Sequence, residues 1–177
     1  MPPDPVLIVG SLALDTIETP FGGVKDTVGG AATYAGLTAS LLAPARLVGV
    51  VGDDFPTQAL DALAARGVDL AGVRVVPGGR SFRWGARYGY DMNDRDTLFT
   101  ELGVFADFSP TIPAHWAESP YVFLANIQPQ LQLGVLDQVE APRFVMADTM
   151  NFWIETAREA LVELLGRVDL LLVNDAE

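Results

Sequence analysis

Apolar residues fall into continuous runs that alternate with stretches of helical periodicity. The runs lie at 6–14, 46–52, 121–126, 143–148 and 168–174. Short runs rich in β-branched residues are typical of strands buried on both faces of a sheet. The helical stretches cover 31–42, 55–66, 130–139 and 152–166. This alternation predicts an α/β fold, a mainly parallel, doubly wound, Rossmann-like sheet with helices on both faces.

Two segments break the alternation. Residues 80–105 are rich in aromatic side chains and hold the turn-forming sequence DMND, which predicts an antiparallel hairpin. Residues 16–28 predict a second hairpin that turns at 21–23. Together they predict a small β-sheet standing off the main body, with three interpretations: a lid, a dimer surface or an edge extension. The prediction is one α/β domain over 1–177 with insertions at about 16–28 and 80–105.

Charge and composition exclude several classes of partner and site. The net charge is -12, and Lys25 is the single lysine, so a nucleic acid or an anionic membrane is not expected as a partner. No apolar run approaches the roughly 20 residues of a membrane span, and no secretory signal is evident, which predicts a cytoplasmic protein. The chain has no cysteine and one histidine, His115, which excludes thiolate and histidine-rich metal sites.

Polar residues follow five of the predicted strands, at the edge where ligands of parallel sheets bind. These candidates are Asp15, the pair Gly29 and Gly30, Asn126 with Gln128, Asp148 with Asn151, and Asn174 to Glu177. Each has a simpler interpretation as a turn or a helix cap, and Asn151 in particular is expected to cap the helix that follows it. Asp53 and Asp54 are expected to cap the helix from Phe55.

The glycine pair and Asp15 suggest the chemistry of a ligand site. Two residues without Cβ let backbone amides at a helix start approach a ligand hydroxyl or phosphate, although a plain turn is the alternative. Asp15 can accept two hydrogen bonds from neighbouring sugar hydroxyls. The motif differs from both the dinucleotide fingerprint and the Walker loop.

The order of these motifs resembles the ribokinase/PfkB family of sugar and nucleoside kinases. The resemblance rests on Gly10 followed by Asp15, the stretch GGAATYAGLTASLLAPARLVGVVGDDF, the interrupting hairpin, DTMN, and the final LLLVNDAE. It implies a ribokinase-like α/β kinase whose β lid closes over a small polyhydroxylated substrate, with ATP and Mg²⁺ as cofactors. A homodimer formed through the β lid is a further option.

The resemblance also implies roles for individual residues. Asp15 would hold substrate hydroxyls, and Gly29 and Gly30 would be the pair at which the lid hinges. The Asn174-x-x-Glu177 set resembles the motif that organises Mg²⁺ through water and phosphate. Thr33 stands where the family usually has an asparagine, and Gln128 stands where some sugar kinases have an acid, so the substrate stays open among sugars, sugar acids and nucleosides.

The family's carboxyl-terminal signature, D-T-x-G-A-G-D or similar, does not occur in the chain. Phosphoryl transfer depends on positioned charges, so the catalytic base and the nucleotide-binding part are expected beyond Glu177, and this portion alone is expected to be inactive. Two other hypotheses stand beside a kinase: a non-catalytic ligand-binding or regulatory protein on the same fold, and an interaction module that dimerises through the β lid.

Overall fold

The main body is a parallel sheet of six strands. The computed structural model describes residues 3–92, 94–175 and 177. The strands run in the order β10-β9-β8-β1-β4-β5, and each neighbouring pair is parallel. Their bounds are β1 Val6–Val9, β4 Ala45–Gly52, β5 Val68–Val76, β8 Tyr121–Leu124, β9 Phe144–Asp148 and β10 Leu170–Leu172.

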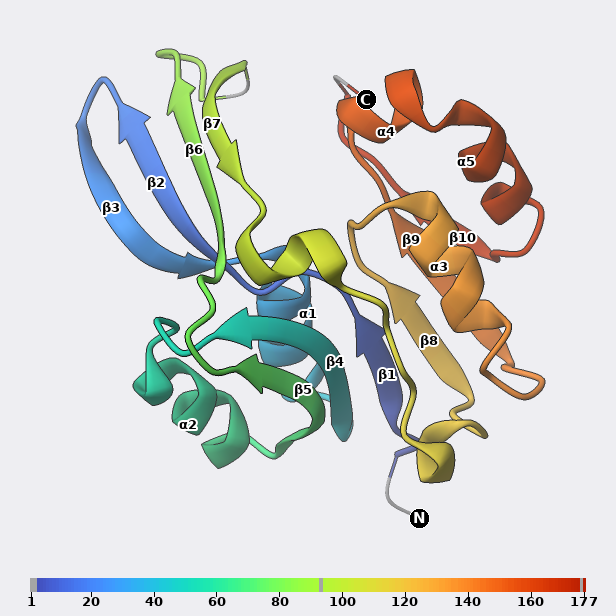
Figure 1. The fold of residues 1–177 in the computed structure, drawn as a ribbon. Coiled ribbons are helices and arrows are strands. Elements are labelled where there is room, and N and C mark those ends of the chain that lie inside the picture. The colour runs from blue at the N-terminus through green and yellow to red at the C-terminus, as the bar shows by residue number, and fades with distance from the viewer. Residues whose placement is uncertain (1–2, 93, 176) are drawn as a thin grey trace.

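Helices cover both faces of this sheet (Figure 1). On one face α1 (Ala31–Ala39) and α2 (Thr57–Ala65) enclose a core that contains Ile8 and Leu47. On the other face a second core contains Leu7 and Val48, and it is enclosed by α3 (Pro129–Leu136), α4 (Asn151–Thr156), α5 (Arg158–Leu165) and the 3-10 turns η1 (Gly103–Asp107) and η2 (Ala114–Trp116). Successive strand residues enter opposite cores, so the doubly wound α/β prediction is confirmed.

A separate four-stranded sheet, called here the small sheet, stands off the body at the upper left of Figure 1. Its order is β3-β2-β6-β7, with β2 and β6 parallel and both outer pairs antiparallel. The strands are β2 Ala13–Thr19, β3 Gly22–Gly29, β6 Phe82–Tyr88 and β7 Arg95–Glu101. The two predicted hairpins are therefore present and join into one sheet.

Several predicted boundaries were wrong. The apolar run at 6–14 is not one strand, because β1 ends at Val9 and β2 begins at Ala13 in the other sheet. The first hairpin turns at Pro20 and Phe21 rather than at 21–23. The helical stretch at 152–166 is two helices, since Ala157 leaves helical geometry with φ -131° and ψ 32°.

Strand β5 was not predicted at all. Asp69 and Arg74 interrupt its apolar residues, and only Val68 of its nine residues is buried, which matches its place at the edge of the sheet. The predicted DMND turn does connect β6 and β7, and the N–H of Gly89 donates to the carbonyl of Asp94 at 3.3 Å. Asn93, within that turn, lies outside the described residues. Among the described helices, none has the length and apolar character needed to cross a bilayer.

Candidate active site at the strand ends

The strand order changes direction at the centre of the main sheet, between β1 and β8. The chain passes from β1 to β4 and β5 on one side, and then returns to β8, β9 and β10 on the other. A Cβ on Gly10, directly after β1, would lie 2.6 Å from the Cβ of Ala125, directly after β8. Only a glycine lets the two connections lie this close, at the point where ligands of doubly wound sheets bind.

Gly30 carries the chain from the small sheet into α1. Its φ is 95°, and a Cβ there would lie 2.4 Å from the carbonyl oxygen of Ser11. The hydroxyl of Ser11 accepts from the N–H of Ala31 at 3.2 Å, and its carbonyl accepts from the N–H of Ala32 at 3.0 Å. The glycine therefore seats the helix start directly on the segment after β1.

Asp15 is enclosed by this glycine pair. A Cβ on Gly29 would lie 1.9 Å from Oδ2 of Asp15, so the carboxylate occupies the space that any other residue would fill. Burial raises the pKa of Asp15 to about 6, although a backbone hydrogen bond from Gly30 partly opposes the shift. A partly desolvated carboxylate is a strong acceptor for ligand hydroxyl groups.

Thr33 acts on the site through the backbone. Its side chain is buried, and its hydroxyl donates to the carbonyl of Gly29 at 2.8 Å. This hydrogen bond spans the first turn of α1 and holds the glycine pair in place. The geometry therefore gives Thr33 a supporting role beside Asp15.

One face of the small sheet is turned toward the carboxyl ends of the main strands. Asp15 on β2 lies opposite Trp84 on β6, and residues paired in this way share a face. The guanidinium of Arg95 on β7 lies 5.9 Å from the centre of the Trp84 ring and 3.9 Å from Oε1 of Glu177, which follows β10. The face of the small sheet that carries Asp15, Trp84 and Arg95 is called here the inner face. It therefore looks across at the end of β10 (Figure 1).

Asp148 lies on the other side, at the end of β9. Burial and the neighbouring charge of Glu177 raise its pKa to about 6, while backbone N–H groups of Asn126 and Thr149 donate to it and oppose the shift. Oδ1 of Asn126 accepts from the indole of Trp153 at 3.0 Å. Asn126 and Asp148 therefore come together at the predicted edge.

The side chains of Gln128 and Asn151 are exposed, unlike those of Asn126 and Asp148. Gln128 is exposed at the start of α3, and no side-chain cap is formed there. Asn151 is exposed as the first residue of α4, whose N-cap position is Met150. The expectation that Asn151 caps this helix was wrong, because the helix starts one residue too early for it.

Gln132 is a residue of this edge that the sequence analysis missed. Its side chain is fully buried, and Nε2 donates to the carbonyls of Leu124, Ala125 and Asp148 at 3.0, 3.2 and 3.1 Å. One amide thus holds the ends of β8 and β9 together. A glutamine in the middle of an apolar helical stretch was the available signal, since buried amides require such partners.

We predict that Gln132→Met lowers the free energy of unfolding by about 2–3 kcal/mol, because methionine fills a similar volume and leaves two buried carbonyls and one partly buried carbonyl without this donor. Chemical denaturation measures the change. The control is Gln130→Met on the exposed side of the same helix, which is expected to have almost no effect. Equal effects of the two changes would contradict the assigned role.

Asn174 and Glu177 hydrogen-bond to each other. The N–H of Asn174 donates to Oε2 of Glu177 at 3.1 Å, and the N–H of Glu177 donates to Oδ1 of Asn174 at 3.2 Å. Within the described ranges no group of three or more acidic or histidine side chains is arranged to hold a metal ion directly. The carboxylate of Glu177 and the amide oxygen of Asn174 are of the ligand type that magnesium prefers, so these two residues could hold the ion through water and phosphate.

Asp53 and Asp54 do not cap α2, whose N-cap position is Pro56. Oδ2 of Asp53 accepts from the N–H of Gly78 at 2.7 Å, and Oδ1 of Asp54 accepts from both the N–H and the hydroxyl of Ser81 at 2.7 Å. The capping prediction was wrong because the partners lie some 25 residues further along the chain. Asp54 instead holds the segment that enters β6.

Comparison with known proteins shows which proteins this chain resembles. No family model matches the chain. A cytidine kinase from Thermococcus kodakarensis is 27% identical over 176 residues, which is 97% of this chain and 62% of that protein. The structure of Burkholderia thailandensis nucleoside kinase in complex with inosine matches with a TM-score of 0.79 and 20% identity, over 97% of this chain and 61% of that one. The chain has the ribokinase fold. The predicted resemblance to the sugar and nucleoside kinases of the ribokinase/PfkB family is thus confirmed.

A further structure with the ribokinase fold was solved with its nucleotide and metal bound. A putative ribokinase II from E. coli, solved with ATP and Mg²⁺, matches with a TM-score of 0.74 and 17% identity, over 96% of this chain and 61% of that one. The chain spans 62% of the length of the cytidine kinase that it resembles.

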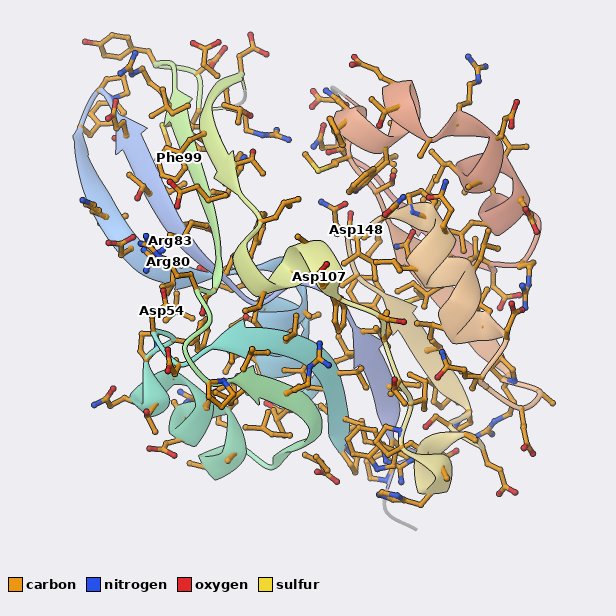
Figure 2. All side chains as sticks on the ribbon, viewed as in Figure 1. Asp54, Arg80, Arg83, Phe99, Asp107 and Asp148 are labelled. Carbon is orange, nitrogen blue, oxygen red and sulfur yellow. The ribbon has the colours of Figure 1, made fainter. Side chains whose placement is uncertain are left out.

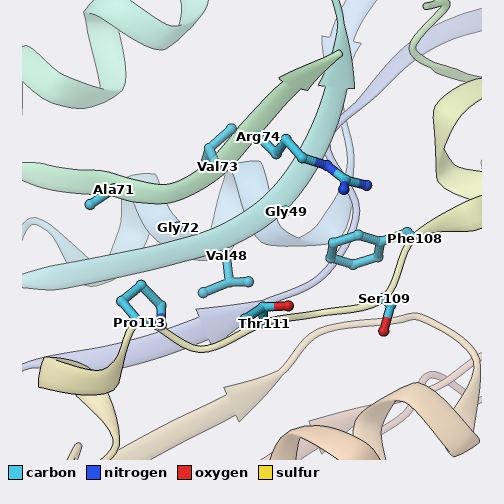
Figure 3. Close-up of a pocket in the computed structure, with 10 residues that line it drawn as sticks. All are labelled: Val48, Gly49, Ala71, Gly72, Val73, Arg74, Phe108, Ser109, Thr111 and Pro113. Carbon is cyan, nitrogen blue, oxygen red and sulfur yellow. The ribbon is translucent and has the colours of Figure 1, made fainter.

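A cavity lies apart from the candidate active site. It has a volume of about 450 Å³ and lies on the face of β4 and β5, beneath the segment from Phe108 to Pro113 (Figure 3). Arg74 is the one titratable residue of its lining. Because none of the carboxylates or amides described above lines it, this cavity is distinct from the candidate active site.

Proposed function

We propose that this chain forms the substrate side of an ATP-dependent kinase that transfers a phosphoryl group to a hydroxyl of a nucleoside. The observation that carries the proposal is the position of Asp15. Its partly buried carboxylate lies on the inner face of the small sheet, beside the glycine pair and across from the strand ends. A carboxylate in this position suits the recognition of vicinal hydroxyl groups.

The nucleoside is favoured over a simple sugar by two observations. A cytidine kinase is 27% identical to this chain, and one of the structures that the chain resembles holds inosine. In addition, Trp84 shares the inner face with Asp15 and is only partly buried. An indole at this position offers a flat apolar surface for a base, while Asp15 binds the sugar.

The small sheet is proposed as a lid over this substrate. It reaches the body through Arg95 and Glu177, on the side of the proposed phosphate site. Magnesium would neutralise phosphate charge there, held through water by Asn174 and Glu177. Asn126 and Asp148 complete the polar lining at the ends of β8 and β9.

Turnover of ATP to ADP tests this function. The protein should be expressed from the complete reading frame of its gene and assayed with Mg²⁺ against cytidine, inosine, other nucleosides, sugars and sugar acids. We expect turnover with nucleosides. Saturable nucleoside binding without turnover would instead support a non-catalytic binding protein, and turnover with sugars alone would contradict the proposed substrate.

Trp84→Leu is predicted to raise the KM for nucleosides about tenfold, because base stacking on an aromatic side chain contributes roughly 1–3 kcal/mol. Steady-state kinetics measures the change. Tyr90→Leu is the control, since Tyr90 is 82% exposed at the turn between β6 and β7. If Trp84→Leu leaves the KM unchanged, the base does not bind on this indole.

A homodimer through the small sheet is a second candidate role. The sheet exposes large apolar side chains, and the rings of Phe21 (76% exposed) and Tyr90 lie edge to face at 5.9 Å. Clustered exposed aromatics are typical of interaction surfaces. Sedimentation equilibrium over a range of protein concentrations distinguishes a dimer from a monomer.

A further inference from the structure

A partly buried ion-pair network joins the small sheet to the body. The guanidinium of Arg83 on β6 binds Asp26 on β3 through NH1, and it binds Asp54, in the loop after β4, through NH2 at 2.9 Å. The Arg83 side chain is only 14% exposed. One residue of the small sheet therefore contacts another strand of that sheet and the main body at the same time.

Asp54 is tightly held by further hydrogen bonds, both to the segment that enters β6 and through it to β4. The N–H and the hydroxyl of Ser81 both donate to Asp54, and the same hydroxyl accepts from the N–H of Gly52, the last residue of β4, at 3.0 Å. Although partial burial disfavours its charged form, hydrogen bonds from Ser81 and Arg83 lower the pKa of Asp54 below its usual value. Asp54 is thus a fixed, charged anchor on the main sheet.

The backbone of the small sheet is shaped to reach this anchor. Asp26 has a φ of 52°, an uncommon conformation for a residue with a side chain, and it lies where the pairing of β2 and β3 is irregular. Bulges of this kind redirect a side chain. The redirected carboxylate of Asp26 meets Arg83.

The network lies at the base of the small sheet, apart from Asp148 (Figure 2). Arg83 precedes Trp84 and is paired with Leu14, which precedes Asp15. Since neighbouring strand residues point to opposite faces, Arg83 faces away from the inner face. It can therefore fix the position of Asp15 and Trp84 without contacting a ligand.

We propose that Arg83 is a positioning residue that fixes the small sheet on the body through Asp54, and thereby sets the position of Asp15 over the strand ends. The effect on catalysis rests on the proposed kinase function, whereas the effect on the position of the small sheet does not. Without Arg83, the carboxylates of Asp26 and Asp54 would face each other unneutralised, and like charges repel.

The same strand provides a matched control. Arg87 also lies on β6 and binds an acid of the small sheet, Glu18, at 2.8 Å. Its side chain is 59% exposed, and its ion pair with Glu18 lies within the small sheet. Arg83→Met and Arg87→Met thus each remove one ion pair with an acid of the small sheet, but only the first also removes the link to Asp54.

The test measures the distance between the small sheet and the body. Because the chain has no cysteine, Val24→Cys on β3 and Val162→Cys on α5, both at exposed positions, provide a unique pair of spin-label sites. Pulsed electron paramagnetic resonance on the ligand-free protein then gives the distribution of distances. We expect a clearly broader distribution for Arg83→Met than for the parent, and an unchanged one for Arg87→Met.

A second variant tests whether a broader distribution arises from damage within the small sheet instead of from the lost link to the body. Asp54→Asn removes the anchor on the body and leaves the pair between Arg83 and Asp26 intact, so it should broaden the distribution as well. Arg83→Lys keeps the charge and should restore part of the narrow distribution. Unchanged distributions in both Arg83→Met and Asp54→Asn, or equal broadening in Arg87→Met, would overturn the proposal.

Kinetics adds a separate readout. If the kinase function holds, Arg83→Met should raise the KM for the nucleoside about tenfold, the size of ordinary coupling between two sites, with a smaller change in kcat. A broadened distance distribution in a protein without turnover would support the positioning role and contradict the kinase function. A normal distribution with normal turnover would contradict the positioning role alone.

Discussion

Replacing Asp15 by asparagine is expected to weaken nucleoside binding about 100-fold, because hydrogen bonds to a charged acceptor contribute roughly 1.5–3 kcal/mol each. Asparagine keeps the shape of the side chain, so the enclosure by Gly29 is preserved while the charge is lost. Isothermal titration with the nucleoside identified by the turnover assay measures the change. Asp69→Asn, on the edge strand β5, removes the same charge away from the site and is expected to bind normally.

The same substitution is expected to stabilise the fold. The pKa of Asp15 rises from 3.8 to about 6 on folding, so the native state binds more protons than the unfolded state between these values. Stability therefore falls as the pH rises through this window, and the loss persists at pH 7. Because the carboxylate is only partly buried and water screens it, we expect a gain of about 1 kcal/mol for Asp15→Asn, or 2–4 °C in Tm.

The pH dependence provides an independent check on Asp15. Between pH 4 and 6 the parent protein should lose stability with rising pH relative to Asp15→Asn, and binding by the parent should weaken as the pH falls below about 6. Thermal melts across this range measure the first effect. A variant that binds as tightly as the parent would show that Asp15 does not contact the substrate.

Gly30→Ala is expected to destabilise the fold by about 3–5 kcal/mol, since it combines two separate costs. Its φ of 95° is disfavoured for alanine, and the new Cβ would lie 2.4 Å from the carbonyl oxygen of Ser11 and 2.8 Å from the amide nitrogen of Ala13. Both contacts are with backbone atoms, which have little freedom to move away. Thermal unfolding should show a decrease in Tm of about 10 °C or more.

Gly67→Ala separates the two costs. Gly67 has a similar φ of 83°, but a Cβ there would meet nothing within 4 Å. We therefore expect a loss of only about 1 kcal/mol, from the backbone conformation alone. If the two substitutions destabilise the protein equally, the close approach of α1 to the segment after β1 is not what requires glycine at position 30.

Much of the main sheet was predictable because most of its strands are continuous apolar runs. Continuous apolar runs identified β1, β4, β8, β9 and β10, and the spacing of apolar residues identified helices close to their observed bounds. Strand β5 escaped because Asp69 and Arg74 interrupt its apolar residues. The other edge strand, β10, was identified from its apolar run although its three residues are exposed, so the expectation that this run is buried on both faces was wrong. Local patterns thus identify a strand by an unbroken apolar run and do not settle whether it is buried.

The candidate site was predictable in part. The rule that ligands bind at strand ends selected Asn126 and Asp148, which meet there, and Asp15, which lies beside the glycine pair. The sequence did not predict Gln132 or Arg83, whose partners are remote along the chain. It also placed Asp54 at a helix cap, because a local partner is the default for an acid before a helix.

The sequence by itself determined the alternation of strands and helices, the two hairpins and the glycine pair, because each depends on the conformational preferences of neighbouring residues. Only the tertiary structure decided that the apolar run at 6–14 divides between two sheets, and that Asp15 and Trp84 share a face. Only the tertiary structure, too, linked Arg83 to Asp26 and Asp54. These features depend on contacts between segments far apart in the chain, which no local pattern specifies.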